Sequence, residues 1–232
     1  MNRIYLFVIV VFLILLATQQ NTFSSEGPKF ERWEKDIQAF EQWDSKNFFP
    51  ADAVLFIGSS SIKGWKTREY FPQLPVINRG FGGSDIEDST HFADRIIFPY
   101  KPAAIVLYAG DNDIAGGKTA QRVFDDYKKF VKQVNDKAPG TPVIFIAIKP
   151  STLRWKLWPE MKKANMMVKE FTTYDERLFY FDSAEPLMGS NGRPKDELFM
   201  TDKLHLNSKG YHAWTEKLRP IIEQALKCGQ KR

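Results

Sequence analysis

Five short apolar runs recur along the chain, each almost unbroken by polar residues. They lie at residues 54–57, 75–78, 104–108, 143–148 and 178–181. Strands with one solvated face alternate between apolar and polar positions, whereas strands that are covered on both faces are apolar throughout. The pattern therefore predicts five strands of a buried parallel sheet.

Segments with helical periodicity separate and follow these runs, at residues 85–97, 119–135, 160–171 and 208–226. Strands and helices in alternation predict right-handed βαβ units with helices on both faces of the sheet. We expect one α/β domain over residues 51–228. Its predicted architecture is a three-layer α/β/α sandwich around a five-stranded parallel sheet, with the flavodoxin-like strand order 2-1-3-4-5.

The amino terminus has a different pattern, because Arg3 is followed by 14 uncharged residues, 4–17, and then by the polar residues 18–22. Such a run makes a helix of about 21 Å, shorter than the roughly 30 Å core of a bilayer. We expect residues 1–24 to be a secretory signal peptide, with an uncleaved membrane anchor as the alternative. Both interpretations predict an exported protein, periplasmic or extracellular.

Residues 25–50 predict an amphipathic helix that packs on the domain. The apolar residues at helical spacing among its charges are Phe30, Trp33, Ile37, Phe40 and Trp43.

Composition narrows the function classes. The net charge is +5, but the basic residues are scattered, so the sequence argues against nucleic-acid binding and leaves open a mild attraction to anionic membrane surfaces. Cys228 is the single cysteine, so the chain cannot form an intramolecular disulfide.

Four of the predicted strands lead into loops rich in glycine and polar residues, beginning at Gly58, Asn78, Gly110 and, after a longer excursion, Asp202. All four loops lie at the carboxyl edge of a parallel sheet, where open α/β folds bind ligands, so we expect them to converge. The first loop holds three hydroxyls, residues 59–61, which alone are as typical of a helix cap as of a nucleophile.

An acyl-transfer site needs a nucleophile, a base oriented by an acid, and donors for the developing oxyanion. Of the three histidines, His91 falls on the polar face of its helix, and His212 lies one turn into the last helix. His205, three residues after Asp202, is therefore the candidate base, with Asp202 as its acid; the alternative for Asp202 is a turn residue.

Two candidate oxyanion donors lie in the other loops. Gly83 can bring its N–H close to a ligand because it has no Cβ. Asn112 offers an uncharged NH₂ group between two aspartates. The alternatives are a loop that needs positive φ for Gly83 and a helix cap or cation site around Asn112.

These four segments resemble the four sequence blocks of the SGNH (GDSL-like) hydrolases, in order, over about residues 53–218. Residues 54–60, 78–83, 110–113 and 202–205 resemble the successive blocks. The resemblance implies a catalytic triad of Ser60, His205 and Asp202, and an oxyanion hole formed by Gly83, Asn112 and the Ser60 N–H. One departure is that Ser59 stands where the family's Gly-Asp-Ser has its aspartate.

The resemblance implies a serine esterase or acylhydrolase that cleaves a carboxylic ester, deacetylase-like or lipase-like, without a metal or organic cofactor, and the amino-terminal segment predicts that it is exported. The expected substrate is a small-molecule, glycan or lipid ester. The alternative is a non-catalytic carbohydrate- or lipid-binding module on the same fold. The loop at residues 149–158 carries Trp155 and Trp158 among cations. These two side chains are as typical of a surface that contacts the substrate as of packing at the start of a helix.

Overall fold

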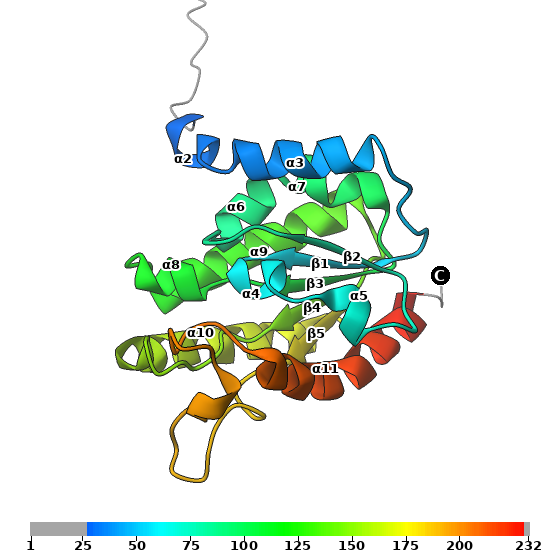
Figure 1. Ribbon diagram of the computed structural model, residues 1–232. Helices are drawn as coiled ribbons and strands as arrows, with labels where there is room; N and C mark the ends of the chain where they lie inside the picture. The colour runs from blue at the N-terminus through cyan, green and yellow to red at the C-terminus, as the bar shows by residue number, and fades with distance from the viewer. Residues whose placement is uncertain (1–26, 230–232) are drawn as a thin grey trace, which may run out of the picture. The chain divides into compact units, whose positions relative to one another are not determined.

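The computed structural model of the protein describes residues 27–229. Its five strands form one parallel sheet in the order β2-β1-β3-β4-β5 (Figure 1), which confirms the predicted fold class. The strands are β1 (Val54–Gly58), β2 (Val76–Gly80), β3 (Ala104–Tyr108), β4 (Val143–Ile146) and β5 (Leu178–Phe181). The predicted signal peptide, residues 1–24, lies outside the described residues.

The central strand β1 shows why the apolar runs are nearly unbroken, because all five of its residues are buried. Val54 and Phe56 belong to a core cluster that includes Trp214 of the last helix. Leu55 and Ile57 point to the opposite face, since successive side chains alternate along a strand. Burying an aliphatic side chain of this size stabilises the fold by roughly 1.5–3 kcal/mol. The edge strands β2 and β5 are partly exposed.

Helices cover both faces of the sheet, with α11 on one side and α9 on the other (Figure 1). Tyr127 of α9 packs edge-on against Phe145 of β4, whereas the flanking Ile144 and Ile146 belong to the cluster with α11. The α-helices of this part of the chain are α3 (Glu34–Asp44), α4 (Ser60–Lys63), α5 (Thr67–Tyr70), α6 (Ile86–His91), α7 (Ala93–Ile96), α8 (Asp111–Ala115), α9 (Ala120–Lys137), α10 (Trp158–Phe171) and α11 (Ser208–Gly229). The 3-10 helices are η1 (Phe98–Tyr100), η2 (Trp155–Leu157), η3 (Thr172–Tyr174) and η4 (Asp196–Leu198).

Residues 27–32, with the short helix α2 (Gly27–Glu31), belong to a separate amino-terminal unit, and the compact unit that holds the sheet begins at Trp33. Helix α3 opens that compact unit, and Arg95 of α7 forms ion pairs with Glu34 and Glu41 of α3. Within residues 27–229, no helix has both the length and the hydropathy needed to cross a membrane.

The segment predicted as one helix over residues 85–97 forms two, α6 and α7. Between them Phe92 has a ψ of 4°, outside the helical range. Its ring is buried and meets Phe81 edge-on, with centroids 6.2 Å apart. The turn therefore brings Phe92 into the core, and the apolar periodicity does not reveal it because it continues through this residue.

Candidate active site

The turn from β1 into α4 depends on Gly58, whose φ is +127°. A Cβ at this position would lie 1.9 Å from the carbonyl oxygen of Tyr108 on the neighbouring strand β3. The next residue, Ser59, donates its N–H to that same oxygen at 2.9 Å. The tight approach makes Ser60 the first residue of α4, at the carboxyl edge of the sheet.

Ser60 contacts His205, although the two residues are 145 positions apart in sequence. Ser60 Oγ lies 3.0 Å from His205 Nε2, and His205 Nδ1 lies 2.6 Å from Asp202 Oδ2. Since a carboxylate only accepts hydrogen bonds, we assign the ring proton to Nδ1, which leaves Nε2 free to accept from the serine hydroxyl. The structure thus brings three of the predicted site residues into one hydrogen-bonded chain.

Asp202 is both a turn residue and the partner of His205. Its Oδ1 accepts the main-chain N–H groups of Leu204 and His205, at 2.9 and 3.0 Å. The hydrogen bond from the His205 ring, helped by these two N–H groups, lowers the pKa of Asp202 to about 2. The carboxylate is therefore ionised at neutral pH, and its orientation is set by the main chain of its own loop.

The neighbouring hydroxyls and histidines lie apart from this chain. Ser59 and Ser61 are buried, whereas Ser60 is partly exposed. His91 is exposed, as predicted, and His212 is exposed beside the ring of Tyr70, at 4.8 Å.

Three N–H donors in the loops that hold the predicted site residues are available to a ligand. Gly83 has a φ of +83°, and its N–H, like that of Ser60, donates to no acceptor among residues 27–229. Asn112 uses one amide N–H to donate to the Ser84 carbonyl at 3.1 Å, which leaves the other free.

The amide of Asn112 is held by a residue that the sequence did not single out. Both terminal nitrogens of Arg154 donate to Asn112 Oδ1, at 3.1 Å each. Arg154 also pairs with Asp111, at 3.1 Å. In the sequence, Arg154 is one of several cations in the loop at residues 149–158. Its contact with Asn112 depends on how the chain turns after β4, which the sequence pattern does not show.

The aspartates on either side of Asn112 are each paired with protein cations. Asp111 lies 3.2 Å from the buried Lys149, and although burial raises its pKa, Lys149 and Arg154 hold it below the usual range. Asp113 lies 2.8 Å from Lys118. The sequence left open a cation site at these aspartates. In the structure the cations beside them are lysine and arginine side chains of the protein itself.

Lys118 lies at the centre of a partly buried cluster of carboxylates, of which Asp113 and Asp126 are fully buried. The four carboxylates within 2.8–3.3 Å of its Nζ are those of Asp85, Glu87, Asp113 and Asp126. Burial raises the pKa of Asp113 to about 7, and the neighbouring Asp85 adds to the rise while Lys118 opposes it. Across the part of the chain that the structure describes, no group of three or more His, Cys, Asp or Glu side chains is arranged to hold a metal ion.

Solved structures of other proteins share this fold. A protein from Streptococcus pneumonia superposes with a TM-score of 0.74 at 19% identity, over 83% of this chain and 93% of that one. A GDSL-like lipase from Bacteroides thetaiotaomicron gives 0.68 at 18% identity, over 82% and 98%.

Sequence comparison adds the family. Platelet-activating factor acetylhydrolase IB subunit alpha1 from Bos taurus is 28% identical over 213 residues, which cover 83% of this chain and 87% of that protein. The sequence profile of the GDSL-like lipase/acylhydrolase family matches residues 58–213, from the turn that presents Ser60 to the first turns of α11. The chain therefore belongs to the GDSL-like lipase/acylhydrolase family.

Proposed function

We propose that this protein is an exported serine esterase that cleaves a carboxylic ester through an acyl-enzyme. The observation that carries the proposal is the chain of two hydrogen bonds from Ser60 Oγ through the His205 ring to Asp202. It joins a nucleophile, a base and an orienting acid beside three unused N–H donors. The apolar amino terminus supports export.

In the first half of the reaction, Ser60 Oγ attacks the ester carbonyl while His205 Nε2 accepts the serine proton. The resulting imidazolium is stabilised by Asp202, which is already ionised. The negative charge that forms on the carbonyl oxygen accepts hydrogen bonds from Gly83, Asn112 and the Ser60 N–H. The tetrahedral intermediate collapses when His205 returns the proton to the alcohol oxygen, which breaks the ester bond.

In the second half, water takes the place of the alcohol. His205 Nε2 accepts a proton from that water as it attacks the acyl group on Ser60, and the same donors stabilise the second oxyanion. Collapse releases the carboxylic acid and returns the proton to Ser60. Apart from the attacking water, each step as written uses side chains and N–H groups of the chain itself.

An acetyl ester is the substrate we favour, because the bovine relative is named as an acetylhydrolase. The ester's alcohol part is a glycan or a lipid of the cell envelope, in keeping with the proposed export. A lipid substrate would bring the protein to a membrane surface.

The test is hydrolysis of p-nitrophenyl acetate by the purified protein and its variants. We expect Ser60→Ala and His205→Ala each to lower kcat by about 10⁴-fold or more, with circular dichroism spectra unchanged. A fluorophosphonate probe should label the wild type at Ser60. Wild-type protein that folds but neither cleaves the ester nor reacts with the probe would instead be a binding module.

A further inference from the structure

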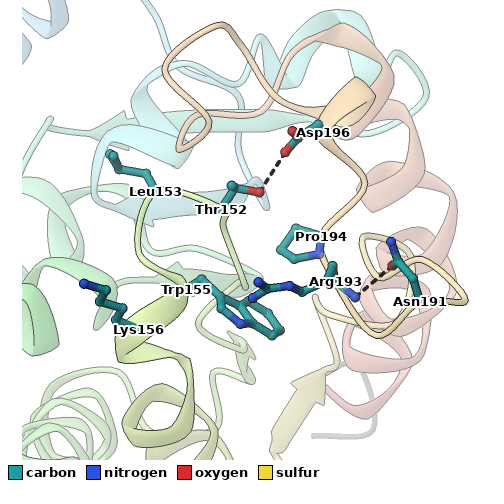
Figure 2. Close-up of a pocket in the computed structure, with 8 residues that line it drawn as sticks. All are labelled: Thr152, Leu153, Trp155, Lys156, Asn191, Arg193, Pro194 and Asp196. Carbon is teal, nitrogen blue, oxygen red and sulfur yellow. Dashed lines mark hydrogen bonds between the residues drawn. The ribbon is translucent and has the colours of Figure 1, made fainter.

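A cavity of about 600 Å³ opens between the loop that follows β4 and the long excursion after β5 (Figure 2). Its lining includes Thr152, Trp155 and Lys156 from the first loop and Asn191, Arg193 and Asp196 from the second. None of these residues takes part in the hydrogen-bonded chain around Ser60, so the cavity is a separate feature of the same face.

The loop that lines the cavity also contacts the loops of the proposed active site. Leu153 donates its N–H to the carbonyl of Lys203 at 3.2 Å, two residues before His205. Arg154, the next residue, holds Asn112, while Leu153 and Trp155 on either side of it line the cavity. The contact with Lys203 puts the loop beside the segment that carries His205, the residue that protonates the departing alcohol in the proposed reaction.

The charges in the cavity are unbalanced. Asp196 is already paired, since it accepts from Thr152 Oγ1 at 2.7 Å and from Lys203 Nζ at 3.0 Å. The Arg193 guanidinium lies over the Trp155 ring, 4.8 Å from its centroid (Figure 2), and forms no ion pair with any residue from 27 to 229. Lys156 forms none there either. The cavity therefore presents uncompensated positive charge.

Hydrogen bonds fix the main chain of Arg193 and leave its guanidinium donors unused within the part of the chain that the structure describes. The main-chain N–H of Arg193 donates to Asn191 Oδ1 at 3.0 Å, and its main-chain carbonyl accepts from the N–H of Gly189 at 2.8 Å. The indole of Trp155 supports the guanidinium plane. Arg193 is exposed, and a guanidinium with free N–H groups matches the oxygens of phosphate and carboxylate groups.

We propose that this cavity binds an anionic group, a phosphate or a carboxylate, on the alcohol part of the ester, and that Arg193 is its main contact. A neutral sugar would stack on an open face of Trp155, but the Arg193 guanidinium lies over one face of that ring. A cationic head group would be repelled. The role in catalysis rests on the proposed esterase function, whereas anion binding does not.

Calorimetric titration of the Ser60→Ala protein tests anion binding without turnover. The probes are inorganic phosphate, glucuronate and the neutral sugar glucose, each added to the Ser60→Ala background and to the same protein with Arg193→Gln, Arg193→Lys or Lys132→Gln. Lys132 is an exposed lysine of α9 that pairs with Asp136, so its variant controls for net charge.

We expect phosphate, glucuronate or both to bind, and Arg193→Gln to weaken that binding by about tenfold or more. Arg193→Lys should restore part of the affinity, and Lys132→Gln should change it little. Binding of phosphate alone identifies a phosphate site, and binding of glucuronate alone identifies a carboxylate site. Glucose binding equal to glucuronate, absence of anion binding, or insensitivity to Arg193→Gln would each overturn the proposal.

A kinetic comparison then tests the role in substrate selection. The substrates are 4-acetoxyphenyl phosphate, 4-acetoxybenzoate and the neutral methyl 4-acetoxybenzoate. For each variant, kcat/KM for an anionic ester is divided by kcat/KM for the neutral ester. Comparing this ratio between variants cancels the intrinsic reactivity of each ester. We expect Arg193→Gln to lower the ratio at least about fivefold, mainly through KM, and Lys132→Gln to leave it unchanged. An unchanged ratio in Arg193→Gln would overturn the substrate role, while failure to cleave any of the three esters would count against the proposed function instead.

Discussion

Arg154 is positioned to act on the reaction through another residue, because its guanidinium holds the carbonyl end of the Asn112 amide. Removing a donor to the oxyanion typically costs about 10²–10³ in rate. Loosening the donor should cost less, so we expect Arg154→Ala to lower kcat by about 10- to 100-fold with a smaller change in KM. Arg154→Lys should restore part of the rate.

A double-mutant cycle separates this positioning role from a general structural one. If Arg154 acts through Asn112, Arg154→Ala should have little further effect on kcat in an Asn112→Ala background. Equal losses of kcat in the wild-type and Asn112→Ala backgrounds would contradict the role, whatever the stability of the variants.

Ser59 gives a prediction about stability. Its hydroxyl is buried and has no hydrogen-bond partner in residues 27–229. A buried polar group without a partner costs roughly 1–3 kcal/mol. We therefore expect Ser59→Ala to leave the free energy of unfolding unchanged or to raise it by about 1 kcal/mol, measured by urea denaturation.

The reverse change, to the family's aspartate, serves as the comparison. Ser59→Asp would bury a carboxylate where the serine hydroxyl finds no donor, so it should lower the urea midpoint. If Ser59→Ala is markedly destabilised, the hydroxyl makes a stabilising contact through a bound water, and the expected gain in stability is wrong.

At the level of elements, α8 presents Asn112 between two aspartates that face different cations. Asp113 shares Lys118 with three further carboxylates, and its pKa is raised to about 7 by burial and by Asp85. A raised pKa means that the folded state keeps a proton that the unfolded state, with a pKa near 4, has lost. Its contribution to stability is therefore largest below about pH 4 and is lost as the pH rises through 7.

Asp113→Asn removes this titration while it retains an acceptor for the Ile86 N–H. Between pH 5 and 8, the wild type should lose about 1–3 kcal/mol of unfolding free energy relative to the variant, as measured by urea denaturation at several pH values. Parallel stability profiles for the two proteins would show that Lys118 keeps Asp113 ionised throughout.

The sequence predicted the elements where the pattern of burial is regular. Residues 104–108 form β3 with the predicted bounds because both faces of that strand are covered. His205 could be predicted because the other two histidines fall on helices away from the loops, and Asp202 because it lies three residues earlier in the same loop. The break at Phe92 and the contact of Arg154 with Asn112 were not foreseen, since each depends on a tertiary contact that leaves the local pattern unchanged.

At the scale of the whole compact unit, α3 lies before the family match at residues 58–213 but closes the structure near the site. A Cβ at Gly83 would lie 3.1 Å from the Trp33 ring, just before α3. At the other end of α3, Asp44 forms an ion pair with Arg79 of the edge strand β2. The helix thus spans from the proposed oxyanion loop to the sheet edge.

The Arg79 contact should be what fastens α3. Arg79 is 7% exposed, and its guanidinium lies over the rings of Phe40 and Trp43 and donates to the Tyr100 hydroxyl at 2.6 Å. Removing one partner of a buried ion pair typically costs about 3–5 kcal/mol of unfolding free energy. Because Asp44 is partly hydrated, we expect Arg79→Met to cost about 2–4 kcal/mol and to lower Tm by roughly 5–10 °C.

A double-mutant cycle assigns that cost to the ion pair. Arg79→Met leaves the Asp44 carboxylate without its cation, and Asp44→Asn removes the charge that is left. The double variant should therefore be about 1–2 kcal/mol more stable than the sum of the two single effects predicts. Limited proteolysis should cut within residues 45–53 first in Arg79→Met, because α3 is then held mainly by Arg95. Additive single effects with unchanged proteolysis would mean that packing on Phe40 and Trp43, and not the charge, fastens the helix.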